Sequence, residues 1–266
     1  METIGLIAGN GRMPALFAKT AKAQGVRVVA VAHEGETQPD LPEHVESLTW
    51  IKVGQLDTII RTFKACGVQR AVMAGGIHKA ALLEHFAPDE RGMKVLARLG
   101  AWSDDAVLRA VADEIESEGI RIVDSTLFLQ SILAPMGVLV GAQPDEAQRR
   151  DIEYGLAVAR GVGQFDIGQT VVVKSRVIVA VEAVEGTDAA IRRGGELARG
   201  GAVVVKVSKP GQDLRFDVPA VGPETVASCR AAGVAVLAIE AGKTLLLEKE
   251  RFLAEAAAAG LCVVGV

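Results

Sequence analysis

Short aliphatic runs alternate along the first half of the chain with longer segments in which apolar residues recur every three or four positions. The aliphatic runs end in glycine-containing turns, and a helical pattern follows most of them. Repetition of this kind is typical of parallel strands covered by helices. The pattern predicts strands at 4–8, 26–32, 70–74 and 120–123, and helices at 15–24, 55–66, 93–99 and 104–117. We therefore predict a Rossmann-like parallel-sheet domain over residues 1–135.

The order of elements changes after a connection at residues 136–143. The pattern there predicts helices at 145–161, 187–199, 223–232 and 249–259, a hairpin of strands 170–174 and 177–184, strands at 202–207 and 234–239, and a terminal strand. Hairpins mixed with strand–helix units are typical of an α+β arrangement. We therefore predict an α/β protein whose second domain, residues 144–266, is a mixed α+β domain.

The charge-free run at residues 125–144 is the nearest approach to a membrane span. Pro135, Gly137 and Gly141 interrupt it, and a spanning helix of about 20 residues would tolerate them poorly. We predict a buried helix followed by an interdomain connection, and an apolar slot here would suit a greasy ligand. The N-terminus has no basic segment followed by an apolar stretch, so we expect a cytoplasmic protein.

Composition excludes several classes of partner. The net charge is −4, and no Lys/Arg-dense block or interleaved aromatic pattern occurs, so we expect no nucleic-acid binding. The three cysteines, Cys66, Cys229 and Cys262, lie far apart in apolar sequence. Without a CxxC spacing they predict buried, reduced thiols.

A charged segment follows the Val-rich strand near residue 203 and is the first candidate site. It carries two lysines, an arginine and two aspartates within twelve positions: Lys206, Lys209, Asp213, Arg215 and Asp217. In an extended conformation Asp213, Arg215 and Asp217 would share one face. Carboxylates beside cations suit a divalent metal and the phosphate oxygens that it meets. An ordinary solvated hairpin tip would explain the same charges.

The turn Gly9-Asn10-Gly11 after the first strand resembles the start of a dinucleotide-binding motif. The third glycine of that motif would fall at Pro14, so the match is incomplete. Glu34 lies near the end of the second strand, where an acid that binds a ribose would be expected. A nicotinamide-dependent oxidoreductase is therefore one alternative. Backbone amides of the turn also suit a phosphate, and a tight turn would need the same glycines.

A second glycine pair, Gly75-Gly76, ends the strand at 70–74 and is followed by His78. Open α/β sheets bind ligands at this end of their strands, although a helix-start residue without a ligand role is equally consistent with His78. The four histidines show no metal-ligand spacing. Any catalytic metal should therefore be a hard ion held by oxygen, most simply Mg²⁺ or Mn²⁺. No motif for a covalent nucleophile is present.

Acidic residues follow the strand at 177–184. Thr187 and Asp188 suit the start of a helix, where a hydroxyl caps it and the helix dipole favours a carboxylate. That explanation does not cover Glu182, which stands inside the otherwise apolar run VIVAVEAV. Gly242-Lys243-Thr244 fails as a phosphate-binding loop because the required upstream glycine is Leu237.

Taken together, these segments resemble the UDP-2,3-diacylglucosamine pyrophosphatases of lipid A biosynthesis, the type unrelated to metallophosphoesterases. The resemblance is carried by GLIAGNGRMP at 5–14, AGGIHK at 74–79, FDIGQTVVVK at 165–174, VEAVEGTDAAIRR at 181–193 and KVSKPGQDLRFDVPAVGPET at 206–225. One departure is Ser103-Asp104-Asp105, where Gly-Asp-Asp is expected, and it weakens any role for those two aspartates.

The resemblance implies hydrolysis of UDP-2,3-diacylglucosamine to 2,3-diacylglucosamine 1-phosphate and UMP with a divalent cation. It implies two domains and a homodimer, and it leaves open a peripheral contact with the inner membrane surface. The aspartate of its RFDxP motif is Asp217 here, expected to hold the metal or activate water, with Asp213 as a second ligand. Lys206, Lys209 and Arg215 are expected to stabilise phosphoryl charge.

The resemblance also suggests where the substrate binds. The candidates are the two glycine-rich turns and the charged or polar residues of the matched segments: Gly9, Asn10, Gly11, Gly75, Gly76, His78, Gln169, Thr187, Asp188 and Gln212. A non-catalytic protein that binds nucleotide sugars or lipids is a further alternative, since the charged segment could serve as a clamp only. Release of UMP would separate the two.

Overall fold

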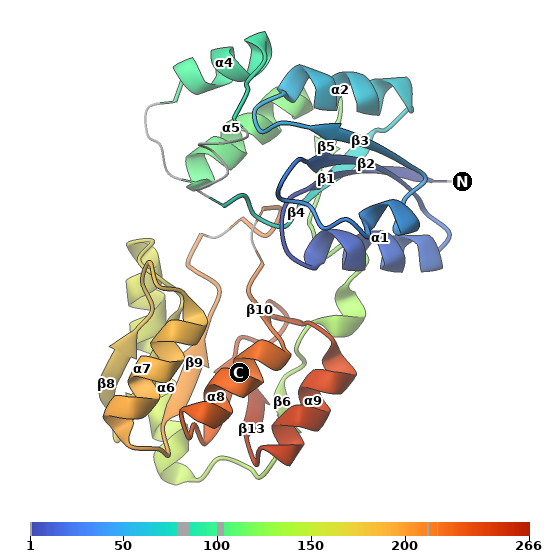
Figure 1. Cartoon of the computed structure of the whole chain (residues 1–266). Coiled ribbons are helices and arrows are strands. Elements are labelled where there is room, and N and C mark those ends of the chain that lie inside the picture. Colours follow the sequence, from blue (N-terminus) through green and yellow to red (C-terminus); the bar gives the residue numbers. More distant parts are fainter. Residues whose placement is uncertain (1, 79–85, 100–103, 212, 217) are drawn as a thin grey trace. The chain divides into compact units, whose positions relative to one another are not determined.

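A computed structural model of the chain describes residues 2–78, 86–99, 104–211, 213–216 and 218–266 (Figure 1). The chain forms two compact units. The N-terminal unit runs to Gln130 and also includes the short segment that begins at Asp213, and the C-terminal unit comprises the rest. The division after Gln130 lies a few residues before the predicted boundary at residue 135.

The N-terminal unit is built around a five-stranded parallel sheet with the strand order β3-β2-β1-β4-β5. A parallel sheet of this kind confirms the Rossmann-like domain that the sequence pattern predicts. Its elements are β1 (Thr3–Ala8), α1 (Met13–Ala23), β2 (Arg27–His33), the 3₁₀ turn η1 (Leu41–His44), β3 (Ser47–Ile51), α2 (Leu56–Ala65), β4 (Arg70–Ala74), α4 (Glu90–Ala97), α5 (Asp104–Ser117) and β5 (Arg121–Ile122). Strand β3 is absent from the sequence prediction, because Ser47 and Thr49 make the short run look like loop.

Side chains alternate between the two faces of this sheet and so create two cores. Ile7, Val29 and Met73 pack with Ile60 and Phe63 of α2 on one face. Ile4, Leu6 and Val28 pack with Phe17 of α1 on the other face. Figure 1 shows α1 and α2 on opposite sides of this sheet. Helices therefore cover both faces, which leaves the carboxyl ends of the strands as the place where polar loops gather.

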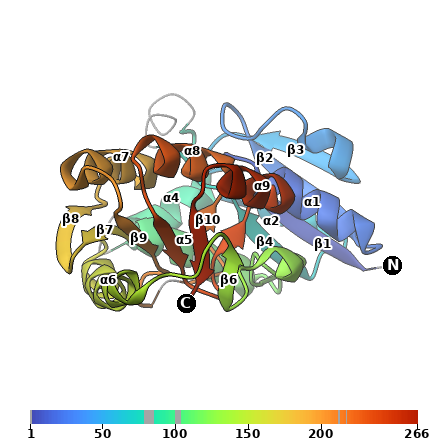
Figure 2. The same cartoon turned by 90° about the horizontal axis from the view of Figure 1, so that it is seen from below.

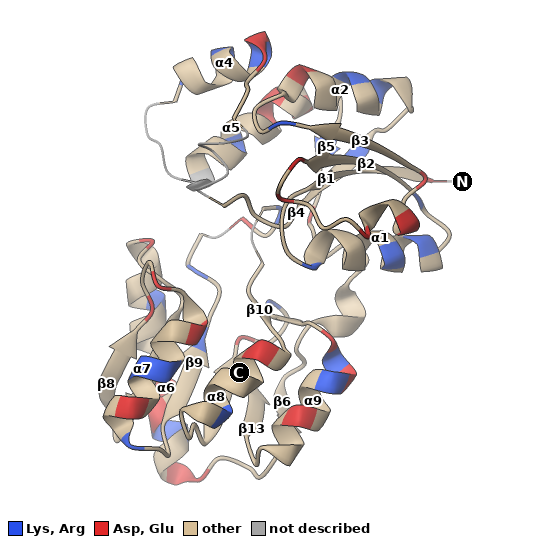
Figure 3. Cartoon of the chain, in the orientation of Figure 1, with Lys and Arg blue, Asp and Glu red and all other residues tan. Residues whose placement is uncertain are grey.

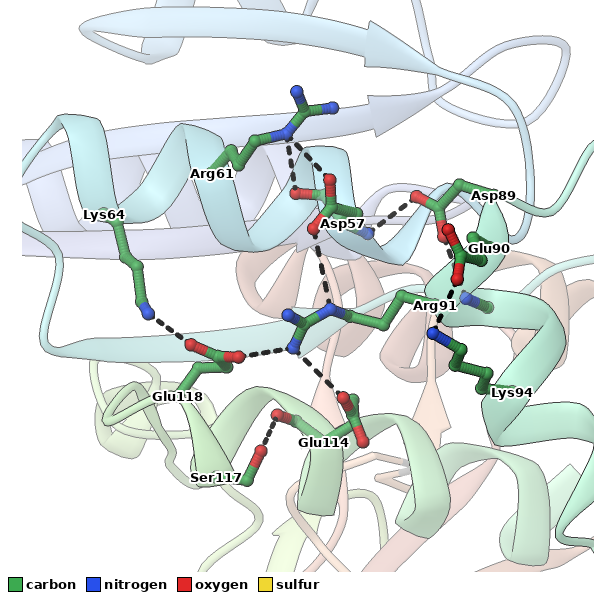
Figure 4. Close-up of polar contacts among 11 residues, drawn as sticks. Asp57, Arg61, Lys64, Asp89, Glu90, Arg91, Lys94, Glu114, Ser117 and Glu118 are labelled. Atoms are coloured by element: carbon green, nitrogen blue, oxygen red, sulfur yellow. Dashed lines mark hydrogen bonds and ion pairs between the residues drawn. The ribbon is translucent and has the colours of Figure 1, made fainter.

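Arg91 of α4 links three helices of the N-terminal unit (Figure 4). Its Nη1 donates to Glu114 Oε1 at 3.0 Å and to Glu118 Oε1 at 2.6 Å, and its Nε lies 3.5 Å from Asp57 Oδ1 of α2. Hydrogen bonds from Lys64 and then Arg91 lower the pKa of Glu118 to about 2. This network is half-buried and still reached by solvent, so it orients α4 and α5 rather than supplying much stability.

The C-terminal unit holds a six-stranded mixed sheet of order β6-β13-β11-β9-β7-β8. Strands β9, β11 and β13 are parallel, and β6, β7 and β8 add antiparallel pairs. Its elements are β6 (Gly137–Val140), α6 (Glu146–Gln164), β7 (Thr170–Lys174), β8 (Val177–Val181), α7 (Thr187–Ala198), β9 (Val203–Lys206), β10 (Ala220–Val221), α8 (Pro223–Ala231), β11 (Val236–Ile239), β12 (Leu245–Leu246), α9 (Lys249–Ala258) and β13 (Cys262–Gly265). A 3₁₀ turn, η2 (Gln130–Ile132), precedes β6.

Alternation again assigns side chains to faces. Val203 and Val205 face Ile152 of α6, whereas Val204 faces Ile191 of α7. Figure 2 shows α7, α8 and α9 on one face of this sheet and α6 on the other. Figure 3 shows the strands mostly tan and the charged residues mostly on helices and loops, as strands covered on both faces require.

Three predictions about this part of the chain need correction. The segment 136–143 is not a plain linker, because β6 lies within it and pairs with β13. The run 125–144 contains this strand and the short turn η2 in place of a helix. Cys66 is exposed, whereas Cys229 and Cys262 are buried as expected, and burial raises the pKa of Cys229 to about 12. Within the described ranges, no helix has the length and apolarity needed to cross a membrane.

Candidate active site

A chain of three polar side chains, two of them buried, lies at the edge of the C-terminal sheet where β9 ends. Lys206 Nζ donates to Thr187 Oγ1 at 2.9 Å, and Thr187 Oγ1 donates to Glu182 Oε1 at 2.8 Å. Lys206 is 6% exposed and Glu182 is 7% exposed. A hydroxyl can accept from an ammonium and donate to a carboxylate at the same time, so Thr187 links Lys206 to Glu182. We call these three residues the relay.

Local structure explains why the relay residues meet. Lys206 is the last residue of β9 and pairs with Thr170, the first residue of antiparallel β7. Glu182 directly follows β8, which pairs with β7, and its Oε2 accepts from the Gln169 N–H at 3.4 Å. Thr187 opens α7. Glu182, which the capping explanation left unaccounted for, is therefore the counter-charge of Lys206.

Two polar atoms near the relay have no hydrogen-bond partner among the described residues. They are Gln169 Oε1 and Asp188 Oδ1, and both atoms are buried. Buried polar atoms are nearly always satisfied, so unsatisfied ones suit a site that a ligand completes. The predicted substrate residues Gln169, Thr187 and Asp188 thus gather at one edge of the C-terminal sheet, beside Lys206.

The loop after β9 is held against neighbouring loops of the same unit. Lys209 Nζ donates to Asp166 Oδ1 at 2.6 Å, and the Ser208 N–H donates to Glu240 Oε2 at 2.9 Å. Burial alone would raise the pKa of Glu240, but this N–H and the nearby Lys243 outweigh it, so the pKa is lowered. Glu240 was not predicted, although an acid directly after the apolar strand 236–239 is the same signal as Glu182.

The two glycine-rich turns of the N-terminal unit meet around Glu36, which is 6% exposed. Asn10 Nδ2 donates to Glu36 Oε2 at 2.9 Å, as does the His78 N–H at 2.9 Å. His78 Nδ1 lies 3.1 Å from the same oxygen, and the Gly76 N–H donates to Asn10 Oδ1 at 3.2 Å. Burial would raise the pKa of Glu36, but the hydrogen bonds from His78 and Asn10 prevail and lower it.

The expectation that Gly9 and Asn10 amides bind phosphate needs correction. The Gly9 N–H donates to Ala74 O and the Asn10 N–H to Gly76 O, each at 2.8 Å. These donors join β1 to the turn after β4, so they are not available to an anion. Glu36, not the predicted Glu34, is the acid between the turns, and its oxygens are occupied by Asn10 and His78. This geometry argues against the ribose contact of a nicotinamide cofactor.

Residues 213–216 form a turn and not the extended segment that was predicted. The Phe216 N–H donates to Asp213 O at 2.9 Å, which closes the turn. Arg215 donates from Nη2 to Asp213 Oδ2 at 2.8 Å, and Arg109 Nη1 of α5 donates to the same oxygen at 3.2 Å. Arg215 Nη1 also lies 3.6 Å from Glu116 Oε1. We call residues 213–216 the motif turn.

The motif turn is packed into the N-terminal unit, although β9 before it and β10 after it belong to the C-terminal unit. Phe216 is 8% exposed and lies in the same core as Phe63 and Ile115. Ser125 Oγ donates to Leu214 O at 2.9 Å. The Arg215 guanidinium is held by Asp213 and Glu116 and lies 4.9 Å from the Phe216 ring centre, so these contacts fix it within the turn. Its role at the phosphoryl group stays a prediction.

Asp217 and Gln212 lie outside the described residues, as do Ser103 and the side chains of Asp104 and Asp105. No group of three or more His, Cys, Asp or Glu side chains in the described ranges could hold a metal ion. Both oxygens of Asp213 accept from arginines, and the bond from Arg215 lowers its pKa. Asp213 is thus balanced by cations and does not fit the role of a metal ligand in this arrangement.

Comparison with known proteins agrees with the motifs. Residues 3–132 match the LpxI N-terminal domain, and residues 135–264 match the LpxI C-terminal domain. The chain belongs to the LpxI family. A curated member from Caulobacter vibrioides, "UDP-2,3-diacylglucosamine pyrophosphatase LpxI", is 35% identical over 277 aligned residues, covering 100% of this chain and 98% of the relative. The two LpxI domains coincide closely with the two units of the structure.

Solved structures are more distant from this LpxI chain. The crystal structure of gox2253 is 11% identical, covering 100% of this chain and 90% of that chain, with a TM-score of 0.34. The biotin carboxylase domain of 2-oxoglutarate carboxylase from Hydrogenobacter thermophilus is 14% identical, covering 65% of this chain and 35% of that chain, with a TM-score of 0.29. Similarity this low carries no argument about function.

Proposed function

We propose that this LpxI family enzyme hydrolyses the pyrophosphate bond of UDP-2,3-diacylglucosamine, giving 2,3-diacylglucosamine 1-phosphate and UMP. The observation that carries the proposal is the full-length similarity to a curated pyrophosphatase, which includes both domains. Water adds to one phosphorus, and the bond from that phosphorus to the bridging oxygen breaks. The diphosphate is anionic, so charge neutralisation and alignment of water are what the protein must supply.

The relay suits the first of these tasks. The ammonium of Lys206 is fixed in position by Thr187 and balanced by Glu182, so it presents an oriented cation without reorganisation. Lys209, at the same edge of the sheet, is the second cation that we assign to the phosphoryl oxygens. Gln169 and Asp188 offer polar atoms for the nucleotide sugar.

We assign the second task to Asp217, on the basis of the RFDxP motif. Its carboxylate would orient the attacking water and accept its proton. The motif turn supports this assignment, because residues 213–216 are fixed immediately before Asp217 by Arg109, Ser125 and the core contact of Phe216.

The test is turnover by purified Asp217→Asn protein. We expect kcat to fall by about 10²–10⁴-fold, the usual range for loss of a general base, with substrate binding retained in calorimetry. Asp40→Asn is a matched control, since Asp40 is exposed and makes no side-chain cap at the start of η1. Near-normal UMP release by Asp217→Asn would contradict the role, and no UMP release by the unmodified enzyme would contradict the function.

A divalent cation, Mg²⁺ or Mn²⁺, is part of the proposal, and it rests on the family resemblance alone. The described side chains do not form a site for it, so we assign it no step. When bound to the diphosphate, such an ion would neutralise charge on the non-bridging oxygens. Exhaustive EDTA treatment should abolish UMP release, and added Mg²⁺ or Mn²⁺ should restore it. Full activity after chelation would remove the ion from the mechanism.

We also propose that the enzyme works in the cytoplasm as a homodimer and meets its lipid substrate at the inner membrane surface. The resemblance supports these points, and the acylated substrate supports the last. Light scattering behind gel filtration measures the dimer directly. Co-sedimentation with vesicles of inner-membrane lipid composition measures the membrane contact, and a monomer that stays in the supernatant would contradict both.

A further inference from the structure

Three large apolar side chains are exposed at the edge of the C-terminal sheet that carries the relay. Phe165, Ile167 and Val184 are 79%, 51% and 101% exposed, respectively. Phe165 ends α6, Ile167 lies in the turn before β7, and Val184 lies in the turn after β8. We call these three residues the apolar patch. Single exposed apolar side chains are common, but a group of them marks an interaction site.

Strand pairing brings the two turns of the apolar patch together. Val171 of β7 pairs with Val181 of β8 in antiparallel register. Gly168, next to Ile167, lies against Glu182, which directly follows β8 and stands two residues before Val184. Close contact confirms the approach, because a Cβ at Gly168 would lie 2.1 Å from Glu182 O. The turn before β7 therefore packs directly on the backbone at Glu182, a member of the relay.

The cations of the proposed site lie beside the apolar patch. A Cβ at Gly163, two residues before Phe165, would lie 2.9 Å from Pro210 Cδ, so the loop that carries Lys209 packs against the end of α6. Lys209 pairs with Asp166, which stands between Phe165 and Ile167. This edge of the sheet thus presents a lysine-containing polar surface directly followed by an apolar one.

We propose that the apolar patch binds acyl chains of the diacylated nucleotide sugar while Lys206 and Lys209 face its diphosphate. The inference rests on the proposed function and deepens it. Charge complementarity supports this occupant, because the substrate joins an anionic diphosphate to apolar chains in the same order as the surface joins lysines to Phe165 and Ile167. The patch replaces the run 125–143 as the acyl site, since β6 is committed to pairing with β13.

Two other occupants fit the apolar patch less well. A stable dimer buries about 800 Å² on each partner, and three side chains supply only part of that area. Binding to an anionic membrane surface takes a cluster of several Lys or Arg side chains, whereas Lys209 and Arg193, the cations beside the patch, are each paired with an acid. Acyl chains that are tethered to a charged head group need neither a large protein surface nor a cluster of cations.

The test compares substrates that differ only in acyl length. The Phe165→Ser/Ile167→Ser double variant is assayed with UDP-glucosamine carrying two long acyl chains and with the same compound carrying two short ones. We expect KM for the long-chain substrate to rise about tenfold or more, since loss of well-buried contacts typically has effects of this size. Both kcat values and the short-chain KM should stay within about twofold, because the charged site is untouched.

Val177→Ser and Leu197→Ser are matched controls. Both side chains are 61% exposed, and they lie at the opposite ends of β8 and α7 from the relay. We expect neither to change either KM. An unchanged long-chain KM in the double variant would overturn the proposal, and so would an equal rise for both substrates. A change of oligomeric state in light scattering, or lost vesicle binding without chain-length dependence, would assign the patch to another occupant. An unmodified enzyme that hydrolyses neither substrate would refute the proposed function instead.

Discussion

Arg215 holds Asp213 with a two-pronged hydrogen bond inside a single turn. Its Nε donates to Asp213 Oδ1 at 3.0 Å, and its Nη2 donates to Asp213 Oδ2 at 2.8 Å. The bond lowers the pKa of Asp213 and raises that of Arg215. Two residues whose charges suggest metal and phosphate chemistry thus shape the backbone that leads to Asp217. Experiments on Asp213 and Arg215 should therefore ask whether they position the motif turn.

The ion pair between Arg109 and Asp213 joins α5 to the motif turn, so its loss should displace the turn. We expect Arg109→Gln to lower kcat by about tenfold to a hundredfold, as small misplacements of reacting groups do, with KM within about threefold. The kcat of Arg109→Lys should fall between those of the unmodified enzyme and Arg109→Gln, because lysine keeps the charge without the planar geometry of arginine. Steady-state kinetics over a range of substrate concentrations measures kcat and KM of both variants.

Arg98→Gln is the control for this prediction, because Arg98 is largely exposed and lies 3.9 Å from Glu114. It should leave kcat and KM unchanged. If Arg109→Gln raised KM without lowering kcat, Arg109 would contact substrate instead of positioning the turn.

Thr187 is the central member of the relay, and its hydroxyl is the atom that matters. Thr187→Val keeps the shape but leaves buried Lys206 without this acceptor, so we expect a loss of about 1–3 kcal/mol in urea unfolding. Under the proposed function kcat/KM should fall by about tenfold or more, because the cation is no longer fixed. Thr187→Ser should retain both properties, and a Ser variant as damaged as the Val variant would show that the methyl group, and not the hydroxyl, is required.

Gly75 and Gly11 distinguish two reasons why a position requires glycine: a positive φ and a close approach of another backbone segment. Both have positive φ, at 81° and 75°. A Cβ at Gly75 would lie 2.2 Å from Asn10 O, whereas one at Gly11 would meet nothing within 4 Å. We expect Gly11→Ala to cost about 1 kcal/mol from backbone strain, and Gly75→Ala to cost several times as much because β1 and β4 loops must separate. Chemical denaturation measures the difference, and equal costs would contradict the observed approach.

Glu36 makes the stability of the N-terminal unit depend on pH. Its pKa in the folded protein is lower than in the unfolded chain, so it binds its proton more readily when unfolded. Its contribution is therefore fully present above the unfolded pKa of about 4.3 and is lost as pH falls through the lower folded pKa. Glu36→Gln should lower Tm near neutral pH and weaken its decline below about pH 4.

Glu34→Gln is the control for that experiment, since Glu34 is two residues away and more exposed. Its Tm profile should follow that of the unmodified protein. If the Tm of Glu36→Gln fell at acid pH as steeply as that of the unmodified protein, other carboxylates would cause the acid destabilisation.

Periodicity in the sequence identified most helices and strands, because burial of one face or both faces is a local property of each segment. Strands β1, β2, β4, β7 and β9 lie within a residue or two of prediction, and the Rossmann order of the first sheet follows from right-handed parallel connections. Short strands with polar or glycine residues, such as β3 and β6, were missed because their pairing partners are distant in the chain.

The motifs also determined the family, since Asp217 and the segments around it can be compared directly with relatives. Tertiary structure decided how the charged residues are used. Arg109 reaches Asp213 across 104 positions, and Glu36 reaches His78 across 42. Lys206 and Glu182 became partners only through the hydroxyl of Thr187. Electrostatic pairing depends on distances of a few ångströms between side chains, and only the folded backbone sets those distances.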